Sequence, residues 1–147
     1  MMSRRVTSCR VDTADNAEVI SRLHRALFDS GDLEAVVDAF FASGFESHNT
    51  PPGLPAGREG VKAFFAIFRD GFTDIEVTVD QLVSQNDMVA IATTTSGTHT
   101  GHLFGVAPTG RRVSVTGIDI VRLADGKVTE HRGLTDTVGL LRQLSGQ

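Results

Sequence analysis

Residues 111–136, RRVSVTGIDIVRLADGKVTEHRGLTD, contain the strongest structural signal in the chain. Asp125-Gly126 is typical of a two-residue type I′ turn, because both central residues of that turn need a positive φ. The stretches on either side of this pair alternate apolar and polar side chains, as half-buried strands do. The sequence therefore predicts an antiparallel hairpin formed by residues 111–123 and 127–136.

Two further strands are expected before this hairpin. From Phe72 onward, Ile75, Val77 and Val79 alternate with polar residues, which is the period of a strand. Residues 85–87, Gln-Asn-Asp, predict a turn into a long strand over 88–99, and the glycines and proline of GHLFGVAPTG predict a loop. The second half of the chain is thus expected to be an antiparallel meander.

The first half has the apolar spacing of helices instead. A first helix is expected from Asp15, where Glu18 completes a capping box, to a stop at Gly31. Further helices are expected from Asp32, from about Arg58 and after the last strand. Helices followed by a meander indicate an α+β fold, in which a twisted sheet curls and three N-terminal helices close its concave face around a pocket.

Composition limits the classes of function. The 147 residues fit a single domain, expected over 15–147 behind a flexible leader at 1–14. The net charge of −4 has no basic stripe, which argues against nucleic acid, and no apolar run is long enough for a membrane span or a signal core. Cys9 is the only cysteine, as suits the cytoplasm. Nine Phe without Trp or Tyr predict a pocket of Phe and aliphatic side chains.

Several stretches of this chain resemble one known family. They are GDLEAV, HNTPPGLPAGREG, SGTHTGHLFGVAPTGRRV and GIDIVRLADGKVTEHR, and together the resemblance covers residues 16–146. They are similar to the SnoaL-like branch of the nuclear transport factor 2-like superfamily. The resemblance implies a cone-shaped α+β barrel with a deep apolar pocket, a homodimer and no cofactor. Members cyclise polyketides by intramolecular aldol chemistry, whereas others are accessory proteins or hydroxylase components.

Asp119 and Asp136 are the main catalytic candidates, because the resemblance places acidic side chains at both positions. Asp119 also lies in the middle of an apolar strand, VTGIDIV, where an ionised carboxylate needs a partner. An aldol cyclisation needs a group that takes a proton from carbon, and a carboxylate whose pKa is raised by an apolar cavity suits that step. A two-residue turn at 125–126 places Arg132 opposite Asp119, so a structural ion pair is the alternative for Asp119. For Asp136 the alternative is an N-cap of the terminal helix. The residues alone leave both alternatives open.

The other candidates surround the expected pocket. His99 is expected to orient a substrate carbonyl or to tie down the loop that follows it. No third ligand stands at metal-site spacing near His99 and His102, so no metal is expected. His131 falls on the face opposite Asp119 and is expected to be structural, and His24 is given no role. The substrate-binding candidates are His48, Asn49, Phe64, Phe68, Phe104, Arg132 and Leu134.

The sequence therefore predicts a polyketide cyclase-like enzyme of secondary metabolism. It is expected to use cofactor-free acid–base chemistry on an apolar or aromatic small molecule. Where many family members have Trp after the Glu-His pair, this chain has Arg132, which predicts a substrate bearing an acid or phenolate. The alternatives are a non-catalytic module that holds a ligand for a partner oxygenase, and a dimeric scaffold with a vestigial pocket.

Overall fold

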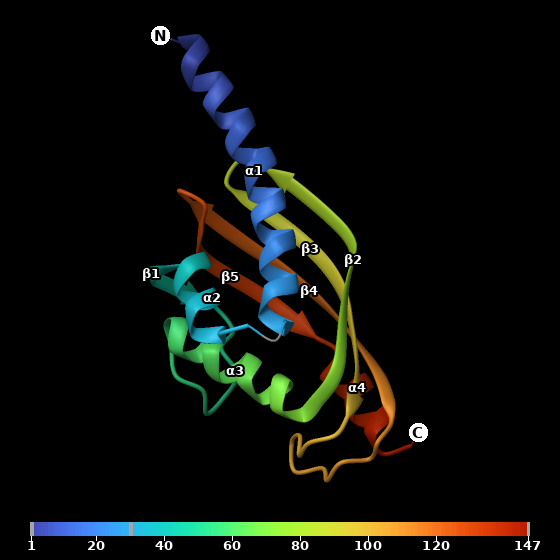
Figure 1. Ribbon diagram of the computed structural model, residues 1–147. Helices are drawn as coiled ribbons and strands as arrows, with labels where there is room; N and C mark the ends of the chain where they lie inside the picture. The colour runs from blue at the N-terminus through green and yellow to red at the C-terminus, as the bar shows by residue number, and fades with distance from the viewer. Residues whose placement is uncertain (1, 30, 147) are drawn as a thin grey trace.

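The computed structural model describes residues 2–29 and 31–146. The sheet has five strands in the order β1-β5-β4-β3-β2. Figure 1 shows this twisted sheet with helices α1, α2 and α3 lying against one of its faces. The elements in chain order are α1 (Met2–Phe28), α2 (Leu33–Phe40), β1 (Phe41–Ser47), α3 (Gly57–Gly71), β2 (Phe72–Gln85), β3 (Met88–His99), β4 (Arg112–Ala124), β5 (Lys127–Thr135) and α4 (Thr137–Leu144).

The α+β fold expected from the sequence is confirmed, with one strand added. Strands β2 to β5 form the predicted antiparallel meander, and Asp125 and Gly126 both have a positive φ, at 51° and 74°, as a type I′ turn requires. The added strand is β1, which pairs in parallel with β5 at the edge of the sheet. The sheet is therefore mixed rather than wholly antiparallel.

The helix boundaries agree with the sequence in the middle of the chain and differ at its start. Asp32 caps α2 by accepting hydrogen bonds from the backbone N–H groups of Glu34 and Ala35. The expected helix start at Asp15 is wrong, because α1 already begins at Met2. The flexibility of residues 1–14 stays a prediction, and Met1 lies outside the described residues.

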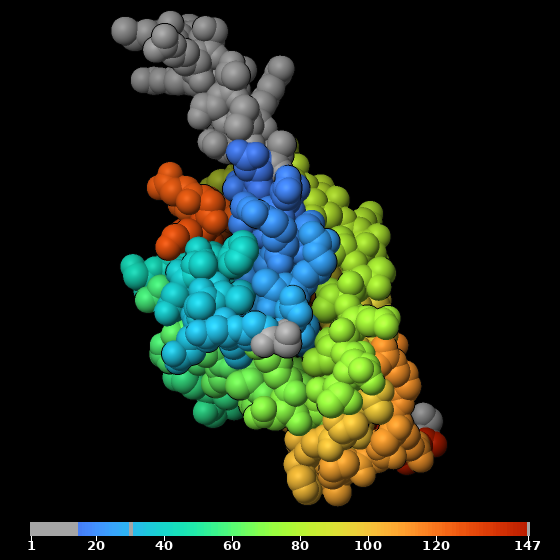
Figure 2. Space-filling model, in the orientation of Figure 1, coloured from blue at the N-terminus to red at the C-terminus, as the bar shows by residue number. Residues whose placement is uncertain are grey.

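Two apolar clusters hold the helices on the sheet. One cluster joins α1 and α2 to β1, β3, β4 and β5, with Ile20, Val37 and Val128 completely buried. The second cluster lies at the other end of the sheet and brings α4 against Phe68, Phe72 and Leu103. In the space-filling view, α1, α2 and α3 form a continuous layer over the sheet (Figure 2). Residues of both clusters, among them Ile20 and Phe68, also line the main cavity.

Arg69 fixes the end of α1 to α3. Its guanidinium donates from Nε to the carbonyl of Leu27 at 2.8 Å, from Nη1 to that of Gly31 at 2.6 Å and from Nη2 to that of Ala26 at 2.9 Å. The last carbonyls of a helix lack partners within the helix, and a cation is favoured beside them by the helix dipole. This side chain therefore holds α1 in the position from which it covers the cavity.

Candidate active site

A cavity of about 470 Å³ lies between the concave face of the sheet and helices α1 and α3. Its apolar wall includes Phe28, Phe64, Phe65 and Phe68, whose neighbouring rings pack with centroids 5.0–5.2 Å apart. The placement of Phe64 and Phe68 in the pocket agrees with the sequence prediction. Among the described residues that line the cavity, the ionisable side chains are His24, Asp119 and His131. The cavity thus has an aromatic wall and one small ionisable cluster.

Asp119 lies at the centre of this cluster, between two imidazole rings. Its Oδ1 accepts a hydrogen bond from Nε2 of His131 at 2.7 Å, and its Oδ2 lies 3.5 Å from Nε2 of His24. The side chains of Asp119 and His24 are only 26% and 12% exposed. The ion pair with Arg132, the alternative given for Asp119, is wrong, because Asp119 pairs with Gly133 across the hairpin and Arg132 pairs with Ile120.

A β-bulge explains this difference in register. Leu123 pairs with Val128, but Arg122 pairs with Glu130, so Thr129 is an extra residue on β5. One extra residue moves every later side chain of β5 to the opposite face of the sheet. His131 is therefore brought to the face of Asp119, contrary to its predicted position.

Gly133 makes room for the cluster. A Cβ atom on Gly133 would lie 2.1 Å from Oδ1 of Asp119 and 2.6 Å from Nε2 of His131. These distances are far shorter than any van der Waals contact, so the Asp119–His131 hydrogen bond occupies the space that a side chain at position 133 would take. The glycine is thus required by the side chains of Asp119 across the hairpin and of His131 on its own strand, and not by its backbone conformation.

Two residues near the end of β1 complete the polar side of the cavity. Asn49 donates from its side-chain amide to the carbonyl of Gly133 and accepts from the N–H of Gly133 at 3.1 Å. The hydroxyl of Ser47 lies 3.3 Å from Nδ1 of His131. The end of β1 therefore supports His131, and Asn49, two residues beyond it, supports the backbone beside Asp119 and lines the cavity.

The electrostatics of Asp119 differ from the expectation. Burial by itself raises the pKa of this carboxyl, but the hydrogen bonds and charges of His131 and His24 outweigh burial and lower the pKa from 3.8 to about 2. The expected raised pKa of Asp119 is therefore wrong, and the side chain is a carboxylate throughout the neutral range.

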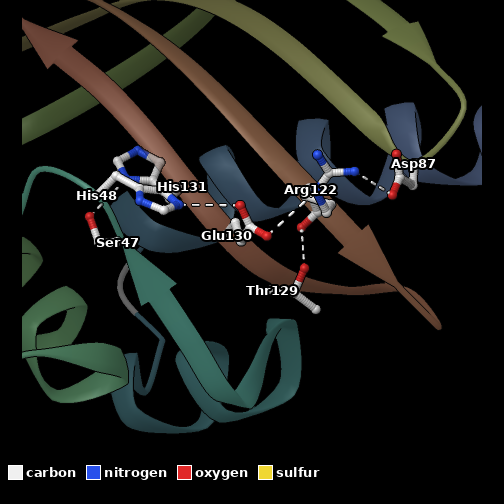
Figure 3. Close-up of polar contacts among 7 residues, drawn as sticks. All are labelled: Ser47, His48, Asp87, Arg122, Thr129, Glu130 and His131. Carbon is white, nitrogen blue, oxygen red and sulfur yellow. Dashed lines mark hydrogen bonds and ion pairs between the residues drawn. The ribbon is translucent and has the colours of Figure 1, made fainter.

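His48 points away from the cavity and belongs to a chain of charged groups along β5 and β4. Its Nε2 lies 3.2 Å from Oε2 of Glu130, and Glu130 lies 3.6 Å from Nε of Arg122. Arg122 in turn contacts Asp87 at 2.7 Å (Figure 3). Figure 3 also shows Thr129 donating to the carbonyl of Arg122, at the bulge. These groups anchor the outer side of the hairpin.

The remaining predicted residues lie outside the cavity or at its rim. Asp136 caps α4 by accepting from the N–H of Gly139 at 2.9 Å, which confirms the alternative weighed for it. Arg132 and Asp136 line a separate, more open groove on the outer face of the sheet. Leu134 is 80% exposed and lines both the cavity and this outer groove. Phe104 is half exposed and packs edge-on against Phe68. Arg132 thus has no position from which to select a charged substrate in the cavity.

His99 ties down the loop that follows β3. It is completely buried, and its Nδ1 accepts from the N–H of Thr109 at 3.2 Å, so the proton of the neutral ring is on Nε2. Its ring packs against Phe72 with centroids 5.8 Å apart. Of the two alternatives weighed for His99, the contacts support the one in which it holds the loop. In the part of the chain that the structure describes, no group of three or more side chains could hold a metal ion.

Comparison with known proteins identifies the family. The sequence matches the family model described as SnoaL-like polyketide cyclase over residues 18–144. The chain belongs to the SnoaL-like polyketide cyclase family. Among solved structures, it resembles TsrD from Streptomyces laurentii, with a TM-score of 0.75 and 29% identity over 88% of this chain and 97% of that one. It also resembles IdmH from Streptomyces antibioticus, with a TM-score of 0.76 and 33% identity over 88% and 98% of the two chains.

Two named cyclases match a shorter part of this SnoaL-like protein. Aklanonic acid methyl ester cyclase DnrD from Streptomyces peucetius is 46% identical over 48 residues, which are 33% of each chain. Nogalonic acid methyl ester cyclase from Streptomyces nogalater is 46% identical over 48 residues, 33% of this chain and 36% of the relative. The match thus spans about a third of the length of these relatives. Among the described residues, no helix has the length and apolarity that crossing a membrane requires.

Sequence reasoning missed His24 and His131 in this SnoaL-like site. His24 had a usable signal, because it follows Ile20 by one helical turn and lies between Leu23 and Leu27 on the stripe that faces the sheet. A polar side chain on a buried stripe needs a partner, and Asp119 was an available one. His131 had no comparable signal, because its face depends on a bulge at Thr129 that the turn residues do not reveal.

Proposed function

We propose that this protein catalyses the cofactor-free intramolecular aldol cyclisation of a polyketide-type ester. The observation that carries the proposal is the cluster of Asp119, His24 and His131 in a cavity whose other lining side chains are mostly apolar and uncharged. Enolate chemistry requires a group that takes and returns a proton in a site where water is largely excluded. This cluster combines a carboxylate with two imidazoles, and imidazole changes its protonation closest to neutral pH.

The reaction requires only that the protein removes a proton from the substrate and later returns it. The cluster removes a proton from a carbon between two carbonyl groups, and the electron pair of that C–H bond becomes an enolate. The enolate carbon attacks a second carbonyl of the same molecule, which forms a C–C bond and leaves an alkoxide. The alkoxide then takes the proton back from the cluster, so the cyclic product has the mass of the substrate. The reaction therefore consumes no electron acceptor and no co-substrate.

The nature of the cavity supports an aromatic substrate. The rings of Phe28, Phe64, Phe65 and Phe68 offer a wall on which a flat ring system can stack. The named relatives act on methyl esters, and a methyl ester has no charge that would have to be buried. We therefore assign the substrate to the polycyclic methyl esters of antibiotic biosynthesis.

The assembly proposed for this enzyme is a cytoplasmic homodimer formed through the outer face of the sheet. Ile118, Ile120 and Leu134 are exposed there by 61%, 41% and 80%. Apolar side chains that gather on one face commonly mark an interaction surface. All three side chains line the outer groove.

The proposed function is tested with the two methyl esters that the relatives' names give. Aklanonic acid methyl ester and nogalonic acid methyl ester are incubated with the wild-type protein and with Asp119→Asn. The products are separated by chromatography, and their molecular masses are measured by mass spectrometry. We expect the wild-type protein to yield a new compound of unchanged mass from at least one ester, and the variant to yield far less. Binding of both esters without conversion would indicate the accessory-module function instead, and neither binding nor conversion would refute the proposal.

A further inference from the structure

Strand β3 changes from apolar to hydroxyl side chains where it crosses the cavity. Alternate residues of a strand share one face, and on the inner face of β3 the buried Val89 and Ile91 are followed by Thr93 and Thr95. Both threonines line the cavity. Valine has nearly the same shape as threonine and also favours strands, so packing and strand formation do not account for the two hydroxyls.

Thr93 is buried, and its hydroxyl has no partner in the protein. The residue is only 7% exposed, and no other described residue forms a hydrogen bond with its Oγ1. Buried polar groups of native proteins are nearly always hydrogen-bonded. A few polar groups without protein partners on the wall of an apolar cavity are typical of a ligand site, where they fix the orientation of the bound molecule. The hydroxyl of Thr93 is therefore free to bind a molecule in the cavity.

Thr93 and Asp119 lie on either side of the same part of the cavity. Thr93 on β3 is paired with Gly117 on β4, and Asp119 follows two residues later on β4, so the two side chains are diagonal neighbours. Diagonal neighbours on one face of a sheet lie about 7–8 Å apart. Gly117 also lines the cavity and has no side chain that would fill the space between them.

This separation fits a carbonyl compound that forms an enolate. A base reaches the carbon that it deprotonates at about 3–3.5 Å, and a donor to the developing oxyanion lies about 2.7–3.1 Å from that oxygen. The remaining distance is that of a C–C–O unit, in which the carbon loses the proton and the oxygen gains the charge. A carbon between two carbonyl groups is a far weaker acid than a carboxylic acid, so transfer of its proton to Asp119 requires stabilisation of the enolate oxygen.

We propose that, within the cyclisation proposed above, Oγ1 of Thr93 donates a hydrogen bond to the enolate oxygen that forms when Asp119 takes the proton from the substrate carbon. The electron pair of the broken C–H bond spreads onto the carbonyl oxygen, which accepts this hydrogen bond. When the C–C bond forms, that oxygen becomes a carbonyl again, and Asp119 returns the proton to the new alkoxide. Thr93 is thus a catalytic residue that stabilises charge and keeps its own proton throughout.

This assignment rests on the proposed function, and the first test uses the ester that the wild-type protein converts. Thr93→Val keeps the shape of the side chain and removes the donor. We expect its kcat to fall by about 10²–10³-fold, as for loss of one donor to an oxyanion, while Kd for the ester changes by no more than about threefold. Thr93→Ser keeps the hydroxyl and should have a kcat within about tenfold of the wild-type value.

Two controls separate this role from a structural one. Thr78→Val makes the same change at an exposed position of β2 that does not line the cavity, and it should leave kcat unchanged. The midpoint of urea denaturation of Thr93→Val should equal or exceed that of the wild-type protein, because the lost hydroxyl has no partner in the folded chain. If Thr93→Val does not fold, Thr93→Ala replaces it with the same expected loss of kcat. A folded variant that keeps the wild-type kcat overturns the proposal.

Deuterium exchange isolates the enolate-forming step. An aromatic β-keto methyl ester without a second ketone can form the enolate but cannot cyclise. In D₂O, the wild-type protein should exchange a hydrogen between the two carbonyl groups faster than buffer alone, and Thr93→Val should slow this exchange by the factor by which it lowers kcat. Equal exchange by the variant and the wild-type protein overturns the role of Thr93 and leaves the cyclase function intact. A wild-type protein that converts no ester overturns the proposed function itself, and the role of Thr93 with it.

Discussion

Replacing Gly133 with Ala should open the ionisable cluster without unfolding the chain. The new Cβ would lie 2.1 Å from Oδ1 of Asp119, so the carboxylate must move by about 1 Å to reach ordinary contact. A displacement of that size breaks the 2.7 Å hydrogen bond from His131. Because the obstructing atoms are the ends of side chains and not backbone, the strand itself can accept alanine.

The magnitude follows from two opposing contributions. Loss of a hydrogen bond to a charged group costs about 1.5–3 kcal/mol, whereas alanine in place of glycine returns about 0.4–1 kcal/mol through the unfolded chain. The free energy of unfolding of Gly133→Ala should therefore fall by about 1–2 kcal/mol, as measured by urea denaturation. Turnover of the methyl ester should fall by about 10²-fold or more, because Asp119 is no longer held between the two imidazoles.

Gly44→Ala is the matched control for this variant. Gly44 also lies in a strand, β1, but a Cβ at this position meets no atom within 4 Å. This control should be as stable as the wild-type protein or slightly more so, with unchanged turnover. If Gly133→Ala behaved like Gly44→Ala in both stability and turnover, the geometry assigned to the cluster would be refuted.

Four further outcomes are expected. The pKa of the Asp119 carboxyl is lower in the folded chain than in the unfolded chain, so the ionised group contributes about 2 kcal/mol to the free energy of unfolding. This contribution is present above the unfolded pKa of 3.8 and is lost as the pH falls to about 2. The stability difference between wild type and Asp119→Asn in urea should therefore shrink over that range, and a difference that grows in acid would contradict this. Arg69→Met removes two hydrogen bonds to the end of α1 and one to Gly31 beyond it, and should lower the free energy of unfolding by about 2 kcal/mol, which Arg69→Lys recovers only in part; an unchanged midpoint argues against this anchor. Asp32→Ala removes the cap of α2 and should cost about 1 kcal/mol by thermal denaturation. Leu134→Glu should convert the proposed dimer to a monomer in sedimentation, and a monomeric wild type at micromolar concentration would exclude that dimer.

Local sequence signals predicted most of the fold. The Asp125-Gly126 turn, the bounds of β3 and the cap at Asp32 depend on a few neighbouring residues, and the structure agrees with each. The strand β1 was missed because its pairing is with β5, more than eighty residues away, and its own sequence, FASGFES, has little alternation. Local patterns cannot reveal a pairing whose partner strand is so distant.

The site was predicted less well, for a physical reason that one residue illustrates. Asp119 was identified because a carboxylate within an apolar strand needs an explanation, and it does line the cavity. Its partner was assigned by counting from the turn, and the bulge at Thr129 shifts that count by one residue. The shift exchanges Arg132 for His131 on the cavity face. An error of one residue thus turned a network of histidines into a predicted ion pair.

The most direct test of the account compares catalysis with binding in Asp119→Asn. Turnover and the Kd for the converted methyl ester are measured for this variant and for the wild-type protein, after both have been shown to be folded. We expect kcat to fall by about 10²–10⁴-fold while Kd changes by no more than about threefold, because the aromatic wall that binds the ester is untouched. A variant that keeps wild-type kcat would contradict the central claim that this ionisable cluster performs the cyclisation.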